Sequence, residues 1–325
     1  MLSDRLPFDQ SEPARAGSPG KISTPRGTHC DTLTAMNRTL KVRAFAGVMF
    51  LACAFAAYNF QATPPPALTI EKIHDDLYMI VGDGGNVAVY ITNEGVILVD
   101  DKYDQDHAQI MAQIRSVTSQ PVRYILSTHY HADHSGGNTL FTNEAEIIST
   151  RNAHDGIVKH LQSNAPNNMV PARVTFTDEC TIFLGGKEVR AKYYGRAHTN
   201  GDAFVYFPAH RLVHSGDSFT SAPTATPLID YPGGGSVIEW TKTLDAVMNT
   251  LDFDEVMPGH GPMSNKTGMK AYRDRVEVLR SKAQALVRAG KSQADLAKLM
   301  ETDYKWAPNG LQQQWSVPGM MTELK

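Results

Sequence analysis

Short apolar, β-branched runs alternate with glycine- and asparagine-rich turns from residue 77 onward. Runs of four or five such residues between turns are typical of strands. The short turns between them, Gly84-Gly85-Asn86 and Asn93-Glu94-Gly95, favour an antiparallel arrangement of neighbouring strands. We therefore expect an antiparallel opening made of three strands: Leu77–Val81, Val87–Ile91 and Val96–Val99.

Helical spacing then alternates with further strands. Apolar residues recur every three to four positions after Asp104, which predicts a helix with Asp104 as its N-cap. The same reasoning predicts strands at 121–126, near 147, at 189–194, 211–213 and 255–257, with 174–194 folded around a Gly185-Gly186 turn, and helices at 152–161, 237–251 and 272–289. A further helix capped by Ser292 follows Gly290, and we expect this tail to serve packing. The alternation indicates an α/β protein.

The first 57 residues have a different character. Residues 1–35 are rich in Pro, Ser, Thr, Gly and Arg, which predicts a disordered or untranslated leader. From Met36, a basic stretch precedes the apolar residues 44–57 and the small-residue pattern Ala54-Phe55-Ala56, which predicts a signal peptide over 36–57. The apolar stretch is too short for a stable membrane span, while Cys53 offers an alternative lipid anchor. We expect a periplasmic or secreted protein.

Residues 58–325 are then enough for a single domain. Removing the leader leaves Cys180 as the one cysteine, so no intramolecular disulfide is expected. The net charge of −3 provides no basic surface for a polyanion, so we expect no nucleic-acid partner. The oligomeric state is left open.

The densest group of metal-binding residue types follows the predicted strand at 121–126. His129, His131, Asp133 and His134 form the pattern H-x-H-x-D-H. In extended backbone, residues two apart project to the same side, so His129 and His131 can reach one ion. Asp133 and His134 would point toward a second ion. A lone loop histidine is usually just solvated, but four such residues within six positions favour metal binding.

Three later blocks repeat the pattern of a strand, a glycine-bounded turn and a candidate ligand. They contain His198 in A-H-T-N-G-D, Asp217 in H-S-G-D, and His260 in P-G-H-G. Each block alone is weak, because a histidine beside glycine is often a turn residue. Thr199 and Asp202 either orient a metal-bound imidazole or close a turn.

Together with the strand-rich opening, these blocks resemble the metallo-β-lactamase-fold superfamily between roughly Leu77 and Gly261. The resemblance implies a four-layer αββα sandwich with two zinc ions at one edge. By that likeness His129, His131 and His198 hold the first zinc. Asp133, His134 and His260 hold the second, and Asp217 bridges them. Because Ser218 follows directly, a one-residue shift would instead make Asp217 a non-ligand, as in one β-lactamase subclass.

The resemblance also implies a chemistry. Two divalent ions lower the pKa of a shared water, which gives a hydroxide nucleophile, and Asp133 is the expected proton shuttle. We expect an exported dinuclear zinc hydrolase of an acyl C–N, C–O or C–S bond in a small molecule: a β-lactam, lactone, ester or thioester. The alternatives are an iron-dependent oxidoreductase similar to persulfide dioxygenases and a zinc-binding protein without turnover. Histidine at position 131, where flavodiiron relatives carry glutamate, disfavours a redox di-iron role.

The substrate-contacting segments are expected at 82–85 and 221–235, which are rich in Gly and Pro. Thr220 matches neither the tyrosine of lactonases nor the lysine of some β-lactamases. His154 and His160 fall on the predicted helix after the metal loop, where a side chain can reach a cleft. We expect most of the remaining histidines to be ordinary surface or core residues.

Overall fold

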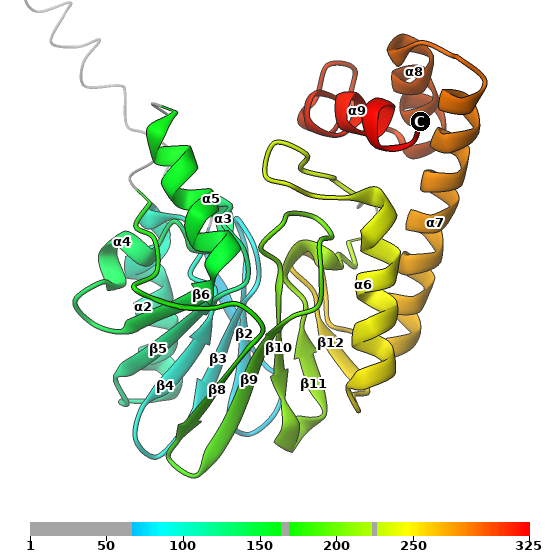
Figure 1. The fold of residues 1–325 in the computed structure, drawn as a ribbon. Helices are drawn as coiled ribbons and strands as arrows, with labels where there is room; N and C mark the ends of the chain where they lie inside the picture. The colour runs from blue at the N-terminus through cyan, green and yellow to red at the C-terminus, as the bar shows by residue number, and fades with distance from the viewer. Residues whose placement is uncertain (1–66, 164–168, 223–225) are drawn as a thin grey trace, which may run out of the picture. The chain divides into compact units, whose positions relative to one another are not determined.

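The computed structural model describes residues 67–163, 169–222 and 226–325. Figure 1 shows two β-sheets face to face, with helices on the outer side of each. The predicted αββα sandwich is confirmed. The predicted leader, the signal peptide and Cys53 lie outside the described residues, and a single domain over 58–325 stays a prediction.

The first sheet contains seven strands in chain order. Strands β1 to β4 pair antiparallel, and β4 to β7 pair parallel. The antiparallel opening is confirmed, and its three strands have the predicted bounds. The strands are β1 (Thr69–Lys72), β2 (Leu77–Val81), β3 (Val87–Ile91), β4 (Val96–Val99), β5 (Val122–Ser127), β6 (Glu146–Thr150) and β7 (Val174–Phe176).

The second sheet has the order β13-β12-β11-β10-β9-β8. Strand β10 pairs antiparallel with β9 and β11, and β11 pairs parallel with β12. As a result β9, β11 and β12 end at the same edge. The strands are β8 (Glu179–Leu184), β9 (Lys187–Tyr193), β10 (Ala203–Phe207), β11 (Leu212–His214), β12 (Glu255–Met257) and β13 (Ser264–Asn265).

Helices cover the two outer faces. On the first sheet these include α2 (His107–Val117), α3 (Ala132–Ser135), α4 (Asn138–Phe141) and α5 (Arg151–Gln162). The second sheet is covered by α6 (Val237–Thr250) and α7 (Lys266–Arg288), followed by α8 (Gln293–Tyr304) and α9 (Leu311–Glu323). Short 3₁₀ turns are η1 (Asp104–Asp106), η2 (Pro208–His210) and η3 (Gly216–Ser218).

The helix start predicted at Asp104 is wrong. Asp104 begins η1, and its carboxylate accepts from the adjacent Gln105 N–H at 2.8 Å. Helix α2 begins at His107. By contrast, Ser292 caps α8 as predicted, in a reciprocal capping box with Asp295.

Strand alternation builds the core between and outside the sheets. In β2, Leu77 and Met79 face the second sheet, while Ile80 faces the helical layer that contains α2. In β10, Val205 faces the first sheet and Phe204 packs toward α6 and α7. The central strands β3, β4, β10 and β11 are therefore buried on both faces, which holds their ends in place.

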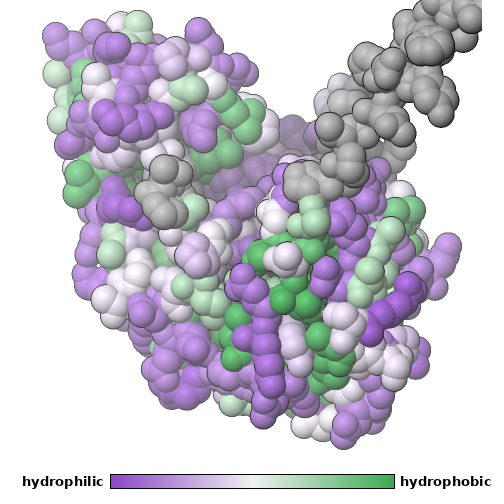
Figure 2. All heavy atoms as spheres, turned by 180° about the vertical axis from the view of Figure 1, so that it is seen from behind, coloured by the Kyte–Doolittle hydropathy of each residue, from purple (hydrophilic) through white to green (hydrophobic). Residues whose placement is uncertain are grey.

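The C-terminal helices α8 and α9 pack through apolar residues onto the cluster formed by α6 and α7. Their outer surface is mainly hydrophilic, as the upper-left lobe of Figure 2 shows. Within the described ranges, no helix combines the length and apolar character needed to cross a bilayer.

Candidate metal centre

Three histidines from two loops converge on one point. The Nδ1 atom of His131 lies 3.2 Å from His129 Nε2 and 2.9 Å from His198 Nε2. Tetrahedral coordination with metal–nitrogen bonds of about 2.0–2.1 Å separates ligand atoms by about 3.3 Å. The spacing of this first cluster therefore fits one small metal ion.

A second cluster lies beside it and includes a carboxylate. His260 Nε2 is 3.2 Å from Asp133 Oδ2 and 3.3 Å from His134 Nε2. His134 Nε2 is 3.6 Å from the same Asp133 oxygen. These three atoms also have the spacing of ligands around one ion.

Asp217 stands between the clusters. Its Oδ1 is 3.2 Å from His134 Nε2 and 3.3 Å from His260 Nε2, and its Oδ2 is 3.7 Å from His198 Nε2. The Oδ1 atom is buried and has no hydrogen-bond partner within the described chain. A buried oxygen left in this state fits a metal position. The structure thus places Asp217, and not Ser218, among the candidate ligands.

Asp100, at the end of β4, orients two of these histidines. Its carboxylate accepts from the Thr128 N–H at 2.7 Å and from the Thr128 hydroxyl at 2.8 Å, and it lies 2.7 Å from His134 Nδ1. Because the Thr128 hydroxyl donates to Asp100, its oxygen accepts from His129 Nδ1 at 3.0 Å. With Nδ1 held in this way, each ring presents its Nε2 atom to the candidate metal position.

The other two histidines of the first cluster are held by the segment 226–236. His131 Nε2 lies 2.9 Å from Asp230 Oδ2, and His198 Nδ1 donates to the Leu228 carbonyl at 2.6 Å. Thr199 and Asp202 bond to each other instead, so they close a turn and do not orient His198. The ligand atoms are therefore Nδ1 for His131 and Nε2 for His198.

The charges of the second cluster shift several pKa values. Burial alone would raise the pKa of Asp217, but the neighbouring His134 and His260 hold it well below its usual range. Burial opposes charge on His260, yet Asp217 and Asp133 raise its pKa to about 9. In the first cluster, burial and the adjacent imidazoles hold the pKa of His129 well below its ordinary value. The second cluster thus retains protons that a metal must displace.

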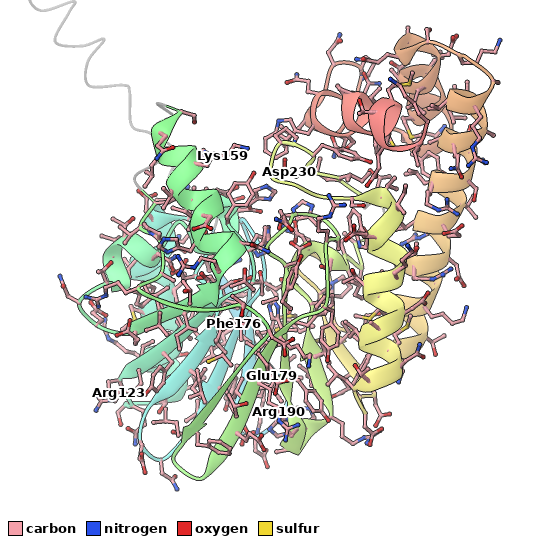
Figure 3. All side chains as sticks on the ribbon, in the orientation of Figure 1. Arg123, Lys159, Phe176, Glu179, Arg190 and Asp230 are labelled. Carbon is pink, nitrogen blue, oxygen red and sulfur yellow. The ribbon has the colours of Figure 1, made fainter. Side chains whose placement is uncertain are left out.

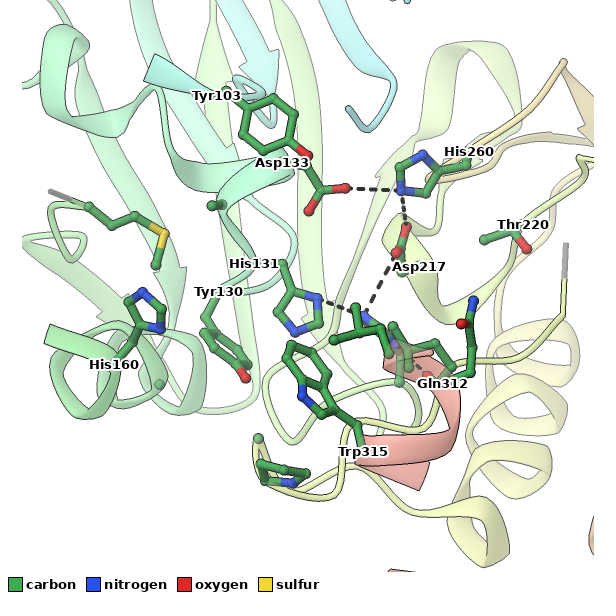
Figure 4. A pocket seen from close by; sticks show the side chains of 18 of the residues that line it. Tyr103, Tyr130, His131, Asp133, His160, Asp217, Thr220, His260, Gln312 and Trp315 are labelled. Atoms are coloured by element: carbon green, nitrogen blue, oxygen red, sulfur yellow. Dashed lines mark hydrogen bonds and ion pairs between the residues drawn. The ribbon is translucent and has the colours of Figure 1, made fainter. Parts of the chain in front are cut away.

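A pocket of about 730 Å³ opens onto both clusters. Figure 4 shows Asp133, His131, His260 and Asp217 at its wall, with Trp315 next to His131. Its lining includes the predicted Thr220, four residues of the expected loop 221–235, and His160. His154 instead bonds to the Ala172 carbonyl at 2.8 Å.

The other expected substrate loop, 82–85, supports the site from behind. No residue of this loop is among those that line the pocket. A Cβ on Gly85 would lie 2.1 Å from His134 Cε1, so only glycine leaves room for that imidazole. The prediction that 82–85 contacts substrate is not supported by this geometry.

Sequence reasoning missed Asp100, Asp230 and Trp315. Asp100 could have been suspected, since it is an acid at the carboxyl end of the strand beside the metal-loop strand. Figure 3 shows Asp230 and Lys159 at the same end of the sandwich, far from Arg123 at the other. Asp230 and Trp315 lie in segments without any ligand pattern, so only the fold brings them to His131.

The comparison with known families agrees with this geometry. A model of the metallo-beta-lactamase superfamily matches residues 80–260, which is more than half of the chain. This chain belongs to the metallo-beta-lactamase superfamily. The match ends at His260, so it covers every candidate ligand but none of the helices after β12.

Two curated relatives match this chain at low identity. The type 2 metallo-beta-lactamase of Elizabethkingia meningoseptica is 22% identical over 247 residues, covering 73% of this chain and 96% of the relative. The alpha subunit of 2,4-dinitroanisole O-demethylase from Nocardioides sp. (strain JS1661) is 26% identical over 200 residues. That alignment covers 60% of this chain and 58% of the subunit, less than two thirds of its length.

Solved metallo-beta-lactamases share the fold. DIM-1 metallo-beta-lactamase aligns with a TM-score of 0.56 and 21% identity, covering 66% of this chain and 98% of DIM-1. The metallo-beta-lactamase from Pontibacter korlensis aligns with a TM-score of 0.56 and 18% identity, covering 65% and 99%. At this identity the similarity establishes the fold and leaves the substrate open.

Proposed function

We propose that this protein is an exported dinuclear zinc hydrolase that cleaves an acyl C–N, C–O or C–S bond of a small molecule. One observation carries the proposal: two clusters of metal-binding side chains lie on either side of Asp217 and open onto one pocket. The candidate substrates are a β-lactam, a lactone, an ester and a thioester. Export rests on the predicted signal peptide over 36–57.

The donor set suits zinc. All the candidate ligand atoms are imidazole nitrogens or carboxylate oxygens, which zinc accepts in catalytic sites. Bound zinc would supply a nucleophile from water at neutral pH and polarise the scissile carbonyl. His129, His131 and His198 would hold one ion and Asp133, His134 and His260 the other, with Asp217 between them.

Three observations support Asp133 as the group that moves a proton. It lines the pocket, its side chain is 23% exposed, and one carboxylate oxygen lies 3.2 Å from His260. Burial would raise the pKa of Asp133, but His134 and His260 lower it to about 2, so the group is ionised at neutral pH. An ionised carboxylate at the pocket wall can accept a proton and pass it to a leaving group.

The relatives widen the range of substrates to test. Two of them are named for β-lactam hydrolysis and for O-demethylation of 2,4-dinitroanisole. Both substrates fit a pocket of about 730 Å³, because pockets of roughly 300–1,000 Å³ accommodate drug-sized molecules. The substrates to be tested therefore include 2,4-dinitroanisole, an aryl methyl ether, as well as the acyl compounds.

The deciding experiment measures metal content and turnover on the chain beginning near Ala57. The substrates are a chromogenic cephalosporin, a lactone, an ester, a thioester and 2,4-dinitroanisole. Two zinc ions per chain with hydrolysis of an acyl substrate would support the proposal. One iron per chain without hydrolysis would replace it by the persulfide-dioxygenase-like alternative. Two zinc ions without any turnover would favour a zinc-binding protein.

A further inference from the structure

The C-terminal helix α9 forms part of the pocket, although it lies outside the family match. Leu311, Gln312 and Trp315 of α9 line the pocket beside the metal-binding residues. The family match ends at residue 260, and DIM-1 is covered over 98% of its own length by only 66% of this chain. The wall that α9 forms therefore lies outside the residues that match the superfamily model.

Trp315 is the large side chain of this wall. Its ring centroid lies 5.5 Å from that of His131, at an interplanar angle of 46°. Figure 4 shows the indole directed toward the candidate ligands. The other tryptophans, Trp240 and Trp306, are 0% and 3% exposed and belong to the hydrophobic core. Trp315 thus presents an aromatic surface to the pocket, whereas the core tryptophans do not.

Tyr130 provides a second aromatic surface next to His131. Its hydroxyl donates to Asp230, and its ring centroid lies 4.6 Å from that of His131. A Cβ on Gly156 would come within 2.9 Å of the ring, and one on Gly233 within 2.6 Å of the hydroxyl oxygen. Contacts with Gly156 and Gly233 and the bond to Asp230 fix the side chain at the pocket wall, so little entropy is lost when a ligand packs on it.

Helix α9 is also held in place by hydrogen bonds. The buried Ser316 hydroxyl bonds to both the N–H and the carbonyl of Ile229, each at 3.0 Å. Glu323 accepts from the Tyr231 hydroxyl at 2.6 Å and from the Val237 N–H at 3.1 Å. These bonds attach the helix to segment 226–236, so Trp315 keeps its place without a ligand.

We propose that Trp315 and Tyr130 form an aromatic slot that selects substrates carrying a planar ring next to the bond to be cleaved. The inference rests on the proposed function, because it names the substrate class of the same site. Flat rings stack on aromatic side chains better than saturated rings of the same size. With the ring in the slot, the adjoining reactive group lies beside His131 and the two clusters.

Binding of a matched pair of ligands that are not hydrolysed tests the slot. Naphthoate and decahydronaphthoate have the same charge and carbon skeleton, but only the first is planar. Calorimetric titration of the zinc-loaded and the metal-free protein should give naphthoate roughly tenfold tighter binding. Trp315→Leu keeps an apolar side chain and should abolish the preference, whereas Trp315→Phe should retain most of it.

Gln314→Ala is the matched control, because this neighbour on α9 is exposed and is not among the residues lining the pocket. It should leave the preference unchanged. Thermal melting and metal content of Trp315→Leu should equal those of the unmodified protein. Equal affinity for the two ligands, or a preference that survives Trp315→Leu, would refute the slot. An intact preference with no turnover of any substrate would support the slot while rejecting the proposed hydrolase.

Discussion

The two clusters share an edge of the sandwich but differ in charge and in support. The first consists of three imidazoles, and two of these are held by segment 226–236, onto which α9 is attached. The second contains Asp133 and borders Asp217, and its His134 is held by Asp100 from the first sheet. The first cluster consists of imidazoles alone and depends on a loop, while the second contains a carboxylate and depends on a strand end.

This difference assigns them different tasks. Burial and the neighbouring imidazoles lower the pKa of His129 in the first cluster. In the second cluster Asp217 and Asp133 raise the pKa of His260 against the effect of burial, so metal binding there is coupled to the release of a proton. Acid–base chemistry should therefore fail when the second cluster is altered. The amount of metal bound by the first cluster should change when segment 226–236 is altered, because this segment holds His131 and His198.

Asp133→Asn gives the largest expected effect. The amide keeps the size of the side chain but cannot accept the proton, so hydrolysis should fall about 10²- to 10⁴-fold. Metal content measured by mass spectrometry should be retained, because His134 and His260 remain and the amide oxygen of Asn can replace the carboxylate oxygen as a ligand. Asp104→Asn, in η1 away from the pocket, serves as the control and should be silent. Unchanged hydrolysis in Asp133→Asn would remove Asp133 from the mechanism.

Asp230→Asn and Asp100→Asn separate the supports of the clusters. The hydrogen-bonding partners of each carboxylate donate to it, so an amide NH₂ would face a donor and lose a bond. Loss of such an outer partner costs about 10- to 100-fold in metal affinity. In chelator competition, Asp230→Asn should lower the metal affinity of the first cluster alone. Asp100→Asn should lower the affinity of both clusters, because Asp100 holds His134 directly and His129 through Thr128. Equal weakening of both sites by Asp230→Asn would contradict the separation.

The pH dependence of metal binding should distinguish the clusters next. The pKa of His260, raised to about 9, keeps this imidazole protonated at pH 7, so a metal must displace the proton. Affinity of the second cluster should rise with pH, about tenfold per unit for each proton, until pH passes the pKa. The first cluster contains His129, whose pKa is lowered, and should change little between pH 7 and 9. Parallel slopes for both ions in metal titrations would be inconsistent with this assignment.

Ser316→Ala gives the smallest expected effect. It removes two buried hydrogen bonds to Ile229, which should destabilise the fold by about 1–3 kcal/mol and lower Tm by roughly 2–8 °C. Leu228 and Asp230, the neighbours of Ile229, still hold His198 and His131, so the affinity of the first cluster for metal should fall only slightly. Ser281→Ala, at an exposed position on α7, is the control. A melting temperature equal to that of the control would show that this contact does not hold α9.

Much of the fold could be predicted because its strands are short and strongly apolar. The three opening strands have the expected bounds, and β12 lies at the predicted 255–257. Strand β10 and helix α9 were not predicted. The AFVYF of β10 is a continuous apolar run with no alternation, and α9 contains Pro318 and Gly319, both poor helix formers.

The candidate ligands could be predicted because each follows a strand within a short motif. A strand end fixes the position of the next few residues, so local spacing already limits where His129, Asp217 and His260 can lie. The residues that hydrogen-bond these ligands are not fixed by a nearby motif in the sequence. Asp230 is 99 positions from His131, and only packing brings them to 2.9 Å.

The sequence by itself determined the strand pattern, the family resemblance and the identities of the candidate ligands, because these depend on local periodicity and on residue chemistry. The tertiary structure decided which imidazole nitrogen faces each cluster, which carboxylates orient the rings, and that α9 closes the pocket with Trp315. These features depend on contacts between residues far apart in the chain. Such contacts exist only once the sheets and helices have packed, since no short segment specifies its distant neighbour.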